Sequence, residues 1–75
     1  MNIIYLRVDV TGHHDRDKFV CFFHNWDGAR LSELVFKSLV KNNLLPVSLI
    51  SRDSKHSEIR LPSKRTVKVL NEDVV

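Results

Sequence analysis

The sequence is poor in residues that build cross-links and linkers, with one cysteine, two glycines and two prolines among 75 residues. A single cysteine excludes a disulfide within one chain and a cysteine-rich zinc module. The wholly apolar runs fall far short of the roughly 20 residues that span a membrane. Residues 1–5 also lack the basic and apolar regions of a signal peptide. We therefore expect a cytoplasmic, intracellular protein that does not bind a membrane.

The composition is that of an ordinary globular domain, with 43% hydrophobic and 28% charged residues. A chain of this length can bury one core but not two, so we expect a single domain over residues 1–75. Such a domain has a free energy of unfolding of roughly 4–11 kcal/mol. So small a margin argues against an elaborate, strained active site.

The first third of the chain predicts a β-hairpin over residues 2–25. Residues 2–10 place apolar side chains at every second position, which is typical of a half-buried strand. Residues 18–25 are apolar on both faces, so this strand is expected to be central in its sheet or to contact a partner. The polar residues 11–17 between them predict the loop of the hairpin.

The middle of the chain predicts one helix, over about residues 28–41. Asp27 is expected to cap its N-terminus, and Trp26 to pack against its first turn. Apolar residues recur at spacings of three and four, which favours one buried stripe of Leu31, Leu34, Val35 and Leu39. Residues 42–43, both asparagine, predict the end of the helix.

The last third of the chain predicts short strands within residues 46–70, followed by a frayed tail at residues 71–75. The expected order of elements is therefore ββαββ or ββαβββ. We assign the chain to the α+β class, as a single small domain with one central helix packed on a mostly antiparallel sheet.

The side chains that could carry chemistry do not form a convincing set. The candidate metal ligands are His13, His14, Asp15, Asp17, Cys21 and His24. Residues three apart in a strand point to opposite faces, so Cys21 and His24 cannot readily share an ion or act as a nucleophile–base pair. The sequence also lacks a glycine-rich phosphate loop. We expect no catalytic residue, metal or cofactor, and hence no enzymatic activity.

Positive charge is concentrated in the C-terminal half. Six cations between positions 52 and 68 form a basic patch, which consists of Arg52, Lys55, Arg60, Lys64, Arg65 and Lys68. This asymmetry is expected of a phosphate-facing surface, although cations also protect edge strands from pairing. Direct binding of RNA or DNA through the patch is therefore the alternative hypothesis. Because Lys64 and Arg65 lie at a predicted turn, we expect the domain to tolerate their replacement.

The apolar residues exceed what one helix can cover. We expect an exposed partner-binding surface that includes Tyr5, Phe22, Phe36 and Val40. Exposed apolar area rimmed by charge marks interaction sites. The favoured hypothesis is a small regulatory or inhibitory protein that acts by binding a larger protein, including one that handles nucleic acid. A homodimer that buries the same surface is the other explanation for these residues.

Overall fold

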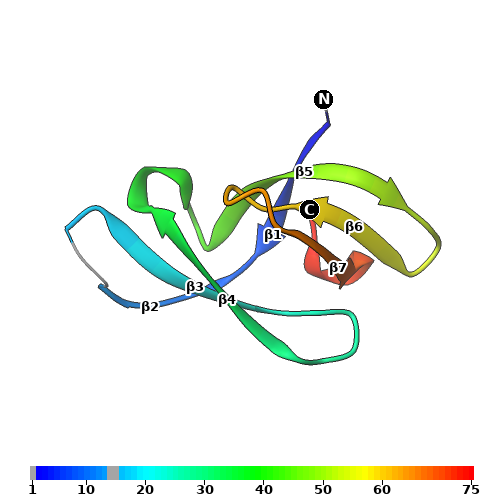
Figure 1. The fold of residues 1–75 in the computed structure, drawn as a ribbon, viewed down its shortest axis with the longest axis horizontal. Helices are drawn as coiled ribbons and strands as arrows, with labels where there is room; N and C mark the ends of the chain where they lie inside the picture. Colours follow the sequence, from blue (N-terminus) through cyan, green and yellow to red (C-terminus); the bar gives the residue numbers. More distant parts are fainter. Residues whose placement is uncertain (1, 14–15) are drawn as a thin grey trace.

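The computed structural model describes residues 2–13 and 16–75, and this part of the chain is almost entirely β-sheet (Figure 1). The seven strands are β1 (Ile3–Arg7), β2 (Asp9–His13), β3 (Lys18–His24), β4 (Arg30–Phe36), β5 (Leu44–Arg52), β6 (His56–Arg60) and β7 (Thr66–Leu70). The only helical segments in these residues are two short 3₁₀ turns, η1 (Lys37–Leu39) and η2 (Asn71–Asp73). Neither has the length or the hydrophobicity to cross a membrane. The predicted α+β class with one central helix is therefore wrong.

The strands form two antiparallel sheets, one in the order β2-β3-β4 and the other in the order β1-β5-β6-β7. β1 and β2 are consecutive segments separated only by Val8, so one stretch of chain contributes a strand to each sheet (Figure 1). β3 lies at the centre of the three-stranded sheet. Both sheets contribute to one core of buried apolar side chains: Leu6, Val8, Cys21, Phe23, Val35, Leu45, Val47, Ile59, Leu61 and Val69.

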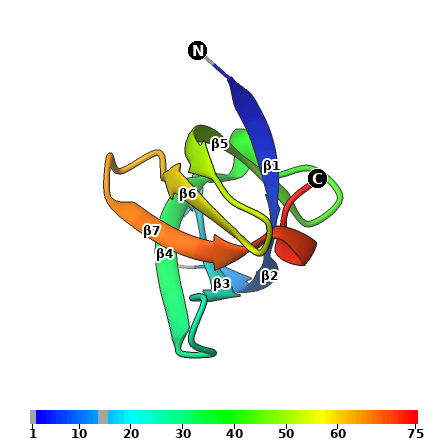
Figure 2. The same ribbon diagram turned by 90° about the vertical axis from the view of Figure 1, so that its right-hand side faces the viewer.

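The two sheets also meet at their outer strands, β4 and β7. The backbone amide of Trp26, in the turn between β3 and β4, donates to the carbonyl of Lys68 in β7 at 2.9 Å. The Arg65 guanidinium donates to the carbonyl of Ser32 in β4 at 2.8 Å. Figure 2 shows β4 and β7 crossing on one side of the molecule. These contacts cover edges that would otherwise expose unpaired backbone groups.

The segment predicted to begin the helix is a hairpin turn. The amide of Gly28 donates to the carbonyl of Asn25 at 3.0 Å, and the amide of Asn25 donates to the carbonyl of Ala29 at 2.8 Å. Gly28 has a φ of +88°, which glycine adopts without a steric penalty. The Asp27 carboxylate accepts the Ala29 amide at 3.0 Å. Asp27 therefore stabilises a short loop between two antiparallel strands and caps no helix.

β4 alternates in a way that the sequence hides. Its inward positions are Leu31, Glu33 and Val35, and its outward positions are Arg30, Ser32, Leu34 and Phe36. Because a glutamate faces the core while a leucine and a phenylalanine face outward, the polarity of the segment has no period of two. The remaining apolar spacing resembles that of a helix. Pairing with β3 overrides this local pattern, as tertiary context commonly does for weak propensities.

The other predicted boundaries also change. Asn42 and Asn43 have φ angles of 55° and 59°, and the flanking Lys41 and Leu44 exchange backbone hydrogen bonds. The two asparagines therefore form a hairpin turn that leads into β5 and do not end a helix.

Residues 71–75, predicted to be a frayed tail, are held in place. After η2, Val75 exchanges backbone hydrogen bonds with Tyr5 of β1 at 3.1 and 2.7 Å. The predicted hairpin loop at residues 11–17 is also shorter than expected, because β2 continues to His13. Residues 14–15 of that loop lie outside the described residues.

Candidate docking surface

The outer face of the three-stranded sheet carries a group of neighbouring apolar side chains. In the register of β3 with β4, Val20 pairs with Leu34. Paired residues share a face of the sheet, and their Cβ atoms lie about 4.5–5.5 Å apart. Phe22 and Phe36 lie on the same face, two residues along from this pair in opposite directions. We call these four residues, Val20, Phe22, Leu34 and Phe36, the apolar face.

The apolar face is open on its β4 side. Leu34 is 44% exposed and Phe36 is 53% exposed, whereas Val20 and Phe22 of the central strand are half-buried. A shallow pocket of about 210 Å³ adjoins Leu34 and Phe36, and η1 and the turn after β6 complete its wall with Leu39 and Pro62. Because a water molecule takes up about 30 Å³ of liquid, this volume matches about seven waters, and the pocket has room for an apolar side chain.

Cations lie at both ends of the apolar face. The Arg30 guanidinium is 4.2 Å from the centroid of the Phe22 ring, and the Lys18 amino group is 5.0 Å from that of Phe36. Cation–ring contacts at exposed sites contribute about 0.5–1 kcal/mol each. These contacts hold positive charge at the border of exposed apolar area. This arrangement is typical of an interaction site.

The structure separates the four residues that the sequence assigns to the partner-binding surface. Phe22 and Phe36 both belong to the apolar face. Tyr5 is exposed on β1, in the other sheet, and pairs with Pro46 of β5. Val40 is half-buried and packs against the core.

Sequence reasoning missed Leu34 and Arg30 as surface residues, because both fell within the predicted helix. The signal that could have placed them is the Asp27-Gly28 pair between two apolar segments, which favours a hairpin. A hairpin there turns residues 30–36 into a strand. Leu34, Phe36 and Arg30 then share one face by alternation alone.

The cations of the predicted basic patch do not gather on one surface. Lys55 and Lys64 lie in the two turns at opposite ends of β6, which is five residues and therefore about 17 Å long. Arg60 is exposed on β6, and Lys68 of β7 pairs in register with the acidic Glu58.

Two arginines of the patch are committed to the protein itself. The Nε atom of Arg52 donates to the Ser57 hydroxyl at 2.9 Å. The guanidinium of Arg65 lies 3.4 Å from the Glu33 carboxylate, and Glu33 is only 7% exposed. Glu33 also accepts the Ser63 amide at 3.2 Å. Arg65 therefore neutralises a buried acid, and the expectation that the domain tolerates its replacement conflicts with this contact.

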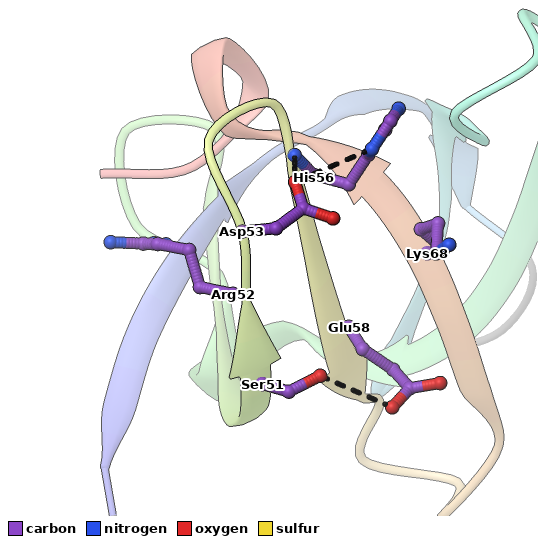
Figure 3. Close-up of a pocket in the computed structure, with 6 residues that line it drawn as sticks. All are labelled: Ser51, Arg52, Asp53, His56, Glu58 and Lys68. Carbon is purple, nitrogen blue, oxygen red and sulfur yellow. Dashed lines mark hydrogen bonds and ion pairs between the residues drawn. The ribbon is translucent and has the colours of Figure 1, made fainter.

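A second shallow pocket, of about 210 Å³, lies between the β5–β6 turn and β7 (Figure 3). It is lined by Ser51, Arg52, Asp53, His56, Glu58 and Lys68. In Figure 3, the guanidinium of Arg52 and the amino group of Lys68 extend to opposite sides of the pocket, and the Asp53 carboxylate lies between them. This mixture of charges does not converge on an anion, so the pocket is a weaker candidate site than the apolar face.

Asp53 has a structural role that can be tested by changing pH. Its carboxylate accepts the backbone amides of Lys55 at 2.8 Å and His56 at 2.7 Å, and these bonds lower its pKa below the ordinary value of 3.8. The stabilising contribution is therefore present above that value and is lost as pH falls through the lower pKa of the folded state.

We expect the stability advantage of the wild type over Asp53→Asn to be largest at neutral pH and to shrink below pH 3.8. Urea unfolding of both proteins over a series of pH values measures this difference. An advantage that does not vary with pH would show that the charge of Asp53 plays no part.

The single cysteine is a core residue. Burial raises the pKa of the Cys21 thiol, and the charge of Glu33 on the paired strand raises it further. Since the thiolate is the nucleophilic form, a raised pKa lowers reactivity at neutral pH. His24 is exposed, while Cys21 faces the core. Within residues 2–13 and 16–75, no group of three or more His, Cys, Asp or Glu side chains is arranged to hold a metal ion. Two candidate ligands, His14 and Asp15, lie outside that part of the chain.

Comparisons with known proteins identify no relative of this chain: no family model, curated protein or solved structure matches it.

Proposed function

We propose that this protein is a non-enzymatic binding module that docks on a larger protein through the apolar face of its three-stranded sheet. Occupying that partner's surface would make it a regulator or an inhibitor. The observation that carries the proposal is the outward placement of Leu34 and Phe36 on β4.

Outward positions of an antiparallel sheet that faces water are normally polar. Here four neighbouring outward residues are apolar, and the fold does not need them for its core. Two of the four are phenylalanines, and aromatic residues are enriched at the centres of protein interfaces. The pocket beside Phe36 offers a place for a side chain of the partner.

The distribution of charge favours a protein partner over nucleic acid. A nucleic-acid surface gathers cations along the path of the phosphates. In this fold, the patch residues Arg52 and Arg65 bond to the protein itself, and Lys55 and Lys64 lie at opposite ends of β6. The cations of the patch are therefore scattered, whereas the apolar residues are gathered.

The proposal is tested by capturing partners from a lysate of the source cells with immobilised protein, with and without nuclease. We expect a protein to be captured equally in both cases by the wild type. Leu34→Ser should lose it, because the exposed apolar centre of the interface is replaced by a polar group. The matched control is Ile50→Ser, since Ile50 is 43% exposed on β5 of the other sheet.

Capture that nuclease abolishes would contradict the proposal and favour the nucleic-acid hypothesis. Equal capture by Leu34→Ser and the wild type would show that the apolar face is not the docking site. Circular dichroism of both variants verifies that they remain folded.

A further inference from the structure

We infer that the apolar face accepts an acidic segment of the partner: an extended stretch with apolar side chains in its middle and carboxylates toward both ends. This inference rests on the proposed function and adds the chemistry of the partner. It follows from the charges that β3 and β4 present outward.

The outward side chains of β3 and β4 include two cations and no acid: Lys18, Val20, Phe22 and His24 on β3, and Arg30, Ser32, Leu34 and Phe36 on β4. The acidic side chain of the same sheet that shares this face is Asp9 of β2, which pairs with Phe22. β4, the most exposed strand of the face, therefore offers only positive charge to a partner.

Arg30 is the cation best placed to bind a carboxylate. Its guanidinium is held over the Phe22 ring, and within the described residues it takes part in no ion pair with an acid. A guanidinium in this position keeps its fork of N–H donors for a carboxylate, which it can bind through two parallel hydrogen bonds. Stacking on the ring also reduces the side-chain entropy lost on binding.

The spacing of the cations sets the length of the segment. Arg30 begins β4, and Lys18 pairs with Phe36 at its other end. Seven residues of strand span about 23 Å at roughly 3.3 Å each. An extended chain laid along β4 would therefore place its middle over Leu34 and an apolar side chain in the pocket beside Phe36. Its carboxylates would lie near Arg30 and Lys18.

A second copy of this chain fits the face less well. Two copies that met through the same face would bring like charges together, which is unfavourable at an interface. An acidic segment of another protein has the complementary charge.

The inference is tested with a random copolymer of glutamate and tyrosine, labelled with a fluorophore, by fluorescence anisotropy at low salt. Polyglutamate and an oligothymidylate serve as comparison probes. We expect the copolymer to bind more tightly than either. Arg30→Glu should weaken copolymer binding by about tenfold, and Arg30→Gln by less. The matched control is Arg60→Glu, because Arg60 is exposed on the outer face of the other sheet.

Equal weakening by Arg30→Glu and Arg60→Glu would overturn the inference, because binding would then depend only on net charge. Tighter binding of oligothymidylate would overturn it in favour of nucleic acid, and a concentration-dependent dimer in sedimentation would favour a second copy. If Phe36→Ala abolishes partner capture while Arg30→Glu does not, the proposed docking function stands and the acidic partner is wrong.

Discussion

Arg65→Ala is expected to lower the free energy of unfolding by about 1–3 kcal/mol, which is the cost of leaving a buried polar group without its partner. The stability of a domain of this size is only roughly 4–11 kcal/mol. The reason is that Glu33, at 7% exposure, would keep the Ser63 amide but lose the guanidinium that neutralises it. Urea denaturation measures the change.

Two further variants isolate the cause of this loss. Lys64→Ala removes a neighbouring cation that is exposed in the same turn, and it should change stability by no more than about 0.5 kcal/mol. Glu33→Gln combined with Arg65→Ala should recover part of the stability, because the neutral amide leaves no charge buried and can still accept the Ser63 amide. A double variant less stable than Arg65→Ala alone would contradict this account of the pair.

Phe36→Ala is expected to weaken the affinity for the captured partner by about 2 kcal/mol or more, or roughly thirtyfold. Phe36 is 53% exposed in the free protein and borders the pocket beside β4, so a partner would bury it. For the same reason its removal should cost the isolated domain little stability. Isothermal titration with the purified partner gives the affinity, and urea denaturation gives the stability.

Tyr5→Ala is the matched control for Phe36→Ala. The sequence assigns both aromatic residues to one surface, but the structure places Tyr5 on the four-stranded sheet, where it is 45% exposed. Its removal should therefore leave the affinity nearly intact. A larger loss with Tyr5→Ala than with Phe36→Ala would move the docking site to the other sheet.

The sequence predicts the strands better than the overall fold. Alternation places Leu6 and Val8 inward and Tyr5 and Arg7 outward, and the structure does the same. Such patterns can be read because every inward side chain is apolar. The helix prediction fails where this condition fails: Glu33 faces inward and is neutralised by Arg65, which lies 32 positions later in the chain. No local pattern reveals a partner that distant.

The candidate site could be predicted only in part. Phe22 and Phe36 were identified as exposed aromatic residues, but their association depends on the register of β3 with β4. That register places Leu34 and Arg30 beside them. The basic patch shows the opposite error. Residues close in sequence, such as Lys64 and Arg65, have different roles, since Arg65 pairs with a buried acid and Lys64 is exposed in the turn.

The most direct test of the central claim is a nuclear magnetic resonance titration of the isotope-labelled protein with its unlabelled partner. Chemical shifts of the backbone amides report which strands the partner contacts. We predict that the largest changes fall within β3 and β4, at residues 18–24 and 30–36, with small changes in β5, β6 and β7. Changes concentrated around Tyr5 or around the pocket between Arg52 and Lys68 would contradict the assignment of the docking surface to the three-stranded sheet.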